Sequence, residues 1–160
     1  MKLLLIALVL TVCFVPTIAR GQSMIVTENG VARAVIVIPA GTFPAPVDPK
    51  APKPRPGSAP SKPDALLAAE EIQSYIEKIS GAKLPIVEES SPQAASGTRL
   101  FVGRTNAIKA AGIKKIPSGY DPSVRADVFS EEGYVLHTKG DQLFISGNED
   151  GPYQGTLYAA

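Results

Sequence analysis

Tryptophan is absent from the 160 residues, cysteine and histidine each occur once, and aromatic residues make up only 6% of the chain. Sugar-binding modules commonly stack aromatic rings on sugars, so a chain this poor in aromatics offers little for such a platform. His137 has no second histidine and no HExxH motif around it, and neither type of glycine-rich phosphate loop is present. Cys13, as the lone cysteine, cannot form an internal disulfide. The sequence therefore predicts no metal site, no cofactor and no thiol chemistry.

An excess of charge of one sign is also lacking. The chain has 16 lysines and arginines against 15 aspartates and glutamates, for a formal net charge of +1. Proteins that bind nucleic acids or anionic membranes usually carry a strongly basic surface. We therefore expect neither a nucleic acid nor a membrane as a partner.

The first 21 residues have the pattern of a secretory signal peptide. Lys2 gives a positive start, residues 3–15 are almost purely apolar, and small residues stand at the −3 and −1 positions if cleavage follows Gly21. A transmembrane anchor would need ~20 apolar residues, and this run is shorter. The sequence predicts a secreted or periplasmic protein whose mature part, residues 22–160, is a single domain.

Local signals predict two hairpins. Asn29-Gly30 lies between the β-branched runs 25–27 and 31–38, which is a strong hairpin pattern. The second run is almost continuously apolar, which is typical of a strand buried on both faces. A second hairpin is expected around Gly140. Further short elements are expected as strands at 84–87 and 99–103 and as a helix at 105–111.

Residues 39–63 contain nine of the chain's 15 prolines. Proline fixes φ and removes a backbone donor, so this stretch cannot form a helix or a central strand. We predict an extended, solvated loop or surface insertion. Two PxxP sequences, 49–52 and 60–63, leave a ligand of a proline-recognition domain as the alternative.

Residues 64–80 have the periodicity of an amphipathic helix. Ser61 or Asp64 can cap its start, and Gly81 is a natural stop. Apolar residues recur at intervals of three and four and predict a core-facing side; they are Leu66, Ala69, Ile72, Tyr75, Ile76 and Ile79. Phe101 and Phe144 are also expected in the core.

Residues 151–160 are typical of the start of a helix. Pro152 suits a first helical turn, but no capping residue closes the segment. We expect the helix to continue in a longer protein, and a chain without the missing turns to expose an apolar patch beside it.

Three blocks of sequence, taken in order, resemble the small N-terminal domain that precedes the catalytic barrel in family 67 α-glucuronidases and family 20 β-N-acetylhexosaminidases. The first, 68–86, contains Ser80-Gly81-Ala82-Lys83-Leu84-Pro85, and the second is 100–105. The third comprises 132–136, 143–147 and 151–159.

This resemblance implies an α/β (α+β) two-layer sandwich, with a mixed, largely antiparallel sheet and helices packed on one side. In those families the domain is accessory, and the acid/base carboxylates lie in the (β/α)8 barrel that follows it. The barrel's catalytic residues therefore have no counterparts at positions of this sequence. The proline-rich stretch is also longer than the resemblance would suggest.

Carboxylates occur mostly as adjacent pairs, whereas glycoside hydrolysis needs two carboxyl groups facing each other across the bond to be cleaved. Neighbours on a helix or strand point in different directions, so adjacency does not create such a site. We therefore predict no catalytic residue among the pairs Glu70/Glu71, Glu88/Glu89, Glu131/Glu132 and Glu149/Asp150. His137 is expected on a strand at the edge of a face.

The leading hypothesis is a non-catalytic accessory domain of a secreted glycoside hydrolase that acts on polysaccharide. One alternative is a stand-alone secreted glycan-binding protein, in which Tyr120 and Tyr153 would be exposed and residues 147–155 would face a ligand. A plain strand-to-helix turn is the other interpretation of that glycine-bounded loop. A truncated, non-functional product is the remaining alternative.

Overall fold

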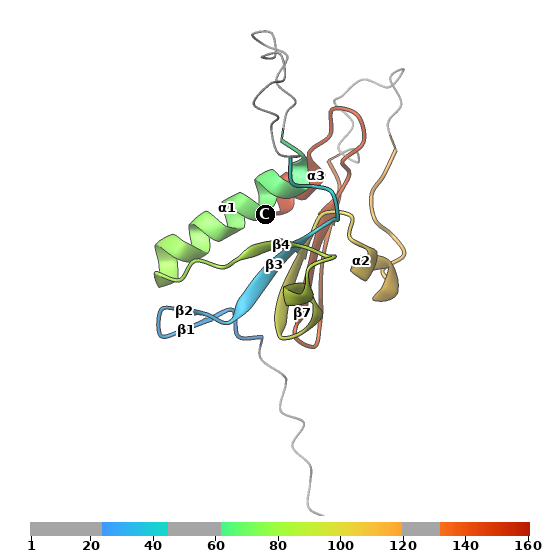
Figure 1. The fold of residues 1–160 in the computed structure, drawn as a ribbon. Helices are drawn as coiled ribbons and strands as arrows, with labels where there is room; N and C mark the ends of the chain where they lie inside the picture. Colours follow the sequence, from blue (N-terminus) through green and yellow to red (C-terminus); the bar gives the residue numbers. More distant parts are fainter. Residues whose placement is uncertain (1–23, 45–61, 120–131) are drawn as a thin grey trace, which may run out of the picture.

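A five-stranded sheet forms the centre of the computed structural model, which describes residues 24–44, 62–119 and 132–160 (Figure 1). The signal-peptide segment and Tyr120 lie outside these ranges, as does most of the proline-rich stretch. The strand order is β4-β3-β5-β7-β6. The strands are β3 (Ala34–Ile38), β4 (Ile86–Glu88), β5 (Thr98–Val102), β6 (Tyr134–Lys139) and β7 (Gln142–Gly147).

The sheet is mixed, and the α+β class predicted from the sequence is confirmed. The pairs β3–β4, β3–β5 and β5–β7 are parallel, and β6–β7 is antiparallel. Parallel pairs thus outnumber antiparallel ones within this sheet, whereas the resemblance implied a largely antiparallel sheet. The residues carry no local sign of the parallel pairs, because parallel neighbours need long crossovers, which leave no signal comparable to a hairpin turn.

Both predicted hairpins are present. β1 (Thr27–Glu28) and β2 (Val31–Ala32) form a separate two-stranded sheet. Asn29 and Gly30 between them have φ of 51° and 75°, the positive values that a type I′ turn requires. The apolar run 31–38 is divided at Arg33, after which β3 continues as a nearly fully buried central strand.

The long helix α1 (Asp64–Ser80) has the predicted bounds. Gly81 ends it in a left-handed conformation with φ of 74°, and its N–H donates to the Glu77 carbonyl at 2.8 Å. The predicted cap at Asp64 is not formed, because Asp64 is already the first helical residue. Pro63 occupies the cap position without a side-chain bond, and Ser61 lies outside the described residues.

The second half of α1 departs from the prediction that its apolar stripe is buried. Leu66, Ala69 and Ile72 are buried, but Tyr75 is 54% exposed and Ile79 is 83% exposed. A groove, described below, opens between the last turns of α1 and the sheet. The periodicity is therefore that of a core helix, while part of its apolar side has no cover within the described structure.

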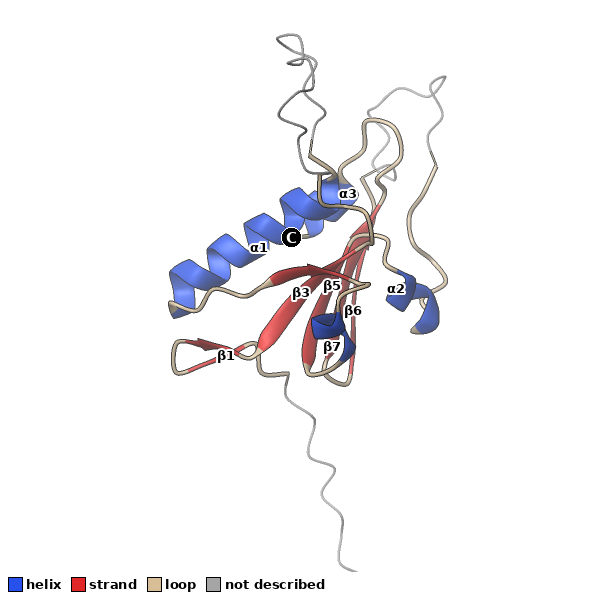
Figure 2. Ribbon diagram, in the orientation of Figure 1, coloured by secondary structure: helices blue, strands red, loops and turns tan. Residues whose placement is uncertain are grey.

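Two apolar clusters lie on opposite faces of the sheet (Figure 2). On one face, α1 and the short α3 (Gly155–Ala159) cover residues that include Ile36, Leu100 and Ile145. On the other, a 3-10 turn (Pro92–Ala95) and α2 (Asn106–Ala110) cover Phe101 and Phe144, whose rings stack with centroids 5.1 Å apart. The expectation that helices pack on one side of the sheet therefore holds for α1 and α3. The short α2 lies on the opposite side and adds a partial third layer.

None of the helices within the described ranges is long and apolar enough to cross a membrane.

Candidate functional site

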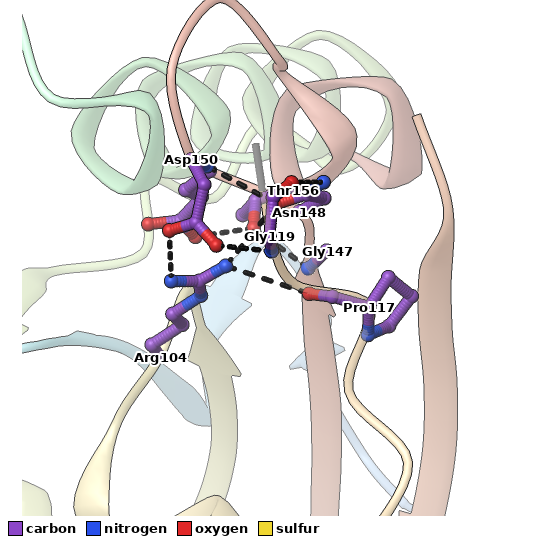
Figure 3. Close-up of polar contacts among 8 residues, drawn as sticks. Arg104, Pro117, Gly119, Gly147, Asn148, Asp150 and Thr156 are labelled. Carbon is purple, nitrogen blue, oxygen red and sulfur yellow. Dashed lines mark hydrogen bonds and ion pairs between the residues drawn. The ribbon is translucent and has the colours of Figure 1, made fainter. Parts of the chain in front are cut away.

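The carboxyl ends of β3, β4, β5 and β7 meet at one edge of the sheet, because these strands run in the same direction. In open α/β sheets this edge is the usual place for ligands. Residues from the segments after β5, after α2 and after β7 form a polar cluster there around one arginine (Figure 3). We call it the edge cluster; its members are Arg104, Pro117, Gly119, Asn148 and Asp150.

Arg104 joins three segments of the edge cluster. Its Nη1 donates to Asp150 Oδ1 at 2.6 Å, and its Nη2 donates to Asn148 Oδ1 at 3.3 Å and to the Pro117 carbonyl at 3.4 Å. The bond from Arg104, supported by the Gly119 N–H, holds the pKa of Asp150 below its usual range. About a third of each of the two side chains is exposed, so the ion pair positions the loops more than it stabilises the domain.

Glu149, the neighbour of Asp150, points to different partners. The Thr156 hydroxyl donates to Glu149 Oε1 and accepts from the Gly147 N–H at 2.8 Å. This chain of bonds connects β7 to α3. Burial raises the pKa of the Glu149 carboxyl, and Asp64 and Asp150 add repulsion, despite the hydrogen bond from Thr156 and the charge of Arg104.

We expect Glu149→Gln to raise the melting temperature at pH 8 and to have less effect at pH 4. A carboxyl whose pKa is raised by folding stabilises the fold when protonated, and that contribution is lost as the pH rises through its folded pKa. Glutamine stays neutral and can still accept the Thr156 hydroxyl. Thermal unfolding of both proteins across this pH range would measure the difference, and a gap that grows toward low pH would contradict this reading of Glu149.

The other carboxylates at this edge accept backbone N–H groups. Glu88 accepts from Phe43 at 3.0 Å, and Glu89 accepts from Asn106 at 2.8 Å. Glu132 accepts from the Gln154 N–H at 2.9 Å. These hydrogen bonds hold loops against the ends of the strands. The carboxylates therefore have a structural role here rather than a role in acid/base chemistry.

The remaining predicted pairs give the same picture. Glu70 pairs with Lys62 at 2.8 Å on the outer side of α1, and Glu131 lies outside the described residues. His137 is an exposed residue of the edge strand β6, with its ring 6.3 Å from that of Phe144. Across the ranges that the structure describes, no group of three or more histidine, aspartate or glutamate side chains could hold a metal ion.

The glycine-bounded segment 147–155 is a tight strand-to-helix connection. A Cβ on Gly147 would lie 2.5 Å from Thr156 N, so β7 and the start of α3 are in backbone contact. Tyr153 within this segment is only 4% exposed, which corrects the expectation that it could offer an exposed ring. This burial depends on tertiary packing, and nothing local in the sequence indicates it.

An apolar groove of about 470 Å³ lies on the α1 face of the sheet, and we call it the α1–β6 groove. Ile72, Ile76 and Ile79 of α1 form one wall. Leu136 of β6, opposite, is 54% exposed. The floor and ends are formed by Val26, Thr27, Ser80, Leu100, Leu143, Ile145, Ala159 and Ala160. The groove therefore lies beside α3, where the sequence led us to expect an exposed apolar patch.

The first sequence block of the resemblance covers most of α1 and ends at the first residue of β4, and the second covers the end of β5 with the turn after it. The third covers the start of β6, most of β7 and all of α3. No family model, curated protein or solved structure matches the chain.

Proposed function

We propose that this chain is the non-catalytic N-terminal accessory domain of a secreted glycoside hydrolase acting on polysaccharide, with an α-glucuronidase-like or hexosaminidase-like parent. Its role is to pack beside a (β/α)8 catalytic domain and to stabilise it. The α1–β6 groove is the observation that carries this proposal. The sequence resemblance and the structural use of the carboxylates at the sheet edge support it.

The walls of the groove suit a helical partner. Ile72, Ile76 and Ile79 follow each other at i, i+4 and i+7 and form a ridge of the kind that packs between the side chains of another helix. Contiguous exposed apolar surface is one mark of an interaction site. A (β/α)8 barrel presents a ring of helices on its outside, so it offers the matching surface.

The glycan-binding alternative relied on two tyrosines as exposed rings that could contact a sugar, and only one of them can still have that role. Tyr153 is buried, and Tyr120 lies outside the described residues. At the sheet edge, Asp150 is engaged by the Arg104 guanidinium and by the Gly119 N–H. Contact with polysaccharide is therefore assigned to the complete enzyme rather than to this domain.

We expect purified residues 22–160 to show no turnover of aryl glucuronides, aryl N-acetylhexosaminides or xylan fragments. The reason is that Glu88, Glu89 and Glu149 accept hydrogen bonds from N–H and O–H groups of the domain itself, whereas glycoside hydrolysis needs two carboxyl groups that face the bond to be cleaved. An active α-glucuronidase and an active hexosaminidase would serve as positive controls. Turnover that disappears in Glu89→Gln or Glu149→Gln would refute the accessory role.

The nucleotide sequence beyond codon 160 distinguishes the proposal from its alternatives. An open reading frame that continues into a barrel supports the accessory role. A stop codon with no barrel nearby would favour a stand-alone protein, and a barrel restored by one frameshift would favour a truncated product.

A further inference from the structure

The strand β6 lies at an open edge of the five-stranded sheet. Within the described residues β7 is its only sheet neighbour, and most of its side chains are exposed. Natural edge strands usually carry charges, prolines or bulges that prevent pairing with another chain. β6 pairs with β7 without a bulge, contains no proline, and has a lysine only at its last position. The opposite edge strand, β4, is by contrast only three residues long.

Alternate residues of β6 present free backbone groups at this edge. The Gly133 carbonyl accepts from the Asn148 N–H at 2.9 Å, which fixes the phase of the β6–β7 ladder. Because bonded residues alternate along an antiparallel strand, every second residue of β6 turns its N–H and C=O away from β7. These outward residues are Tyr134, Leu136 and Thr138. Among the described residues, none forms a hydrogen bond to their outward groups.

The side chains of the outward residues lie on the α1 face of the sheet. Leu136 stands opposite Ile145 of β7, which belongs to the apolar cluster under α1. Tyr134 is 53% exposed and Leu136 is 54% exposed. The open edge therefore combines unpaired backbone groups with apolar side chains that the described residues leave uncovered.

From this arrangement we propose that β6 pairs with β6 of a second copy of this chain, antiparallel about a two-fold axis at Leu136. Only this register pairs all the outward residues with one another. It sets Leu136 opposite its own copy and Tyr134 opposite Thr138. Residues paired in this way exchange both of their N–H···O bonds. The two sheets then form one continuous sheet, with both α1 helices on the same face.

The side chains are self-complementary in this register, which favours a second copy over an unrelated strand. Val135 lies opposite His137, and Lys139 falls opposite Gly133, so like charges do not face each other. An axis moved by one residue would set His137 against itself. A two-fold contact uses the open edge of both copies, so assembly stops at the dimer. This interface goes beyond the proposed accessory role and does not depend on it.

Sedimentation equilibrium of residues 22–160 over about 5–500 μM tests the pairing. One pair of strands is a small interface, so we expect a reversible dimer with Kd on the order of 10–100 μM. Amide hydrogen exchange over the same range identifies the strand. Exchange at Leu136 and Thr138 should slow by about three- to fivefold as the dimer forms, whereas the His137 N–H, which bonds to β7, should be protected throughout.

Two variants act on different parts of the contact. Leu136→Lys sets two like charges against each other at the axis, and Leu136 is exposed, so the monomer should tolerate it. Thr138→Pro removes an outward N–H and leaves the bonds to β7 in place. Each variant should weaken dimerisation about tenfold or more.

Two further variants are the matched controls. Thr138→Ala keeps the outward N–H and should dimerise like the wild-type protein. Ile79→Lys adds a charge to the α1 wall of the groove rather than to the edge strand, and it should also leave dimerisation unchanged.

Three results would overturn the proposal. The first is a monomer at every concentration up to about 500 μM. The second is a dimer in which exchange at Leu136 and Thr138 is as fast as in the monomer. The third is a dimer that Ile79→Lys weakens and Leu136→Lys does not, which would place the contact on α1 instead of β6.

Discussion

Gly147→Ala is expected to destabilise the domain by on the order of 3–5 kcal/mol, close to complete unfolding for a domain of this size. A Cβ at this position would lie 2.5 Å from Thr156 N and 2.7 Å from Gly155 Cα, and it would also collide with Gly155 C. All three are backbone atoms, so no rotation of a side chain can relieve the overlap. The shift would also strain the bond from Gly147 N–H to the Thr156 hydroxyl.

Gly97→Ala is the matched control for this effect. Gly97 has φ of 79°, a conformation that favours glycine, but a Cβ there would meet nothing within 4 Å. Its replacement should therefore cost only the conformational strain, about 1–2 kcal/mol. Urea unfolding of both variants measures the difference. Similar stability losses would show that β7 and α3 are not in the close contact described.

Phe144→Ala is expected to cost about 3–5 kcal/mol, through lost burial and the cavity left behind. Phe144 is fully buried at the centre of the cluster that α2 covers, and its ring stacks on that of Phe101. His137→Ala serves as the control, because His137 lies opposite Phe144 in the register but is exposed on β6.

Urea unfolding would give both free energies. A loss below about 1 kcal/mol for Phe144→Ala would contradict the assignment of this ring to a packed core.

Elements with local causes could be predicted from the sequence. The period of apolar residues defined α1 to its exact ends, and Gly81 ends it because glycine adopts positive φ without strain. The turn at Asn29-Gly30 has the geometry that this dipeptide favours. In each case the residues that determine the structure lie within a few positions of one another.

Features that depend on distant contacts could not be predicted. Arg104 and Asp150 are 46 residues apart, and neither sequence segment reveals the other as its partner. The same holds for the strand order, since β5 lies between β3 and β7 although all three are separated by long connections. The exposure of Ile79 and the burial of Tyr153 also follow from tertiary packing rather than from local pattern.

We propose that a following catalytic domain packs on the α1–β6 groove. Ile79→Glu is suited to test it, because Ile79 lines the groove and is 83% exposed in the described structure. A charge at this position meets water in the isolated domain but would be buried under a partner, where an unpaired charge is costly. Gln93→Glu, which adds the same charge at an exposed residue away from the groove, is the control.

The most direct measurement is the change in unfolding free energy caused by Ile79→Glu in two polypeptides. One is residues 22–160 alone, and the other is the same chain extended by the residues that its gene encodes downstream. We expect a change below about 0.5 kcal/mol in the isolated domain and a loss above about 2 kcal/mol in the extended polypeptide, with Gln93→Glu near zero in both. A change near zero for Ile79→Glu in both polypeptides would contradict packing of a following domain in the groove.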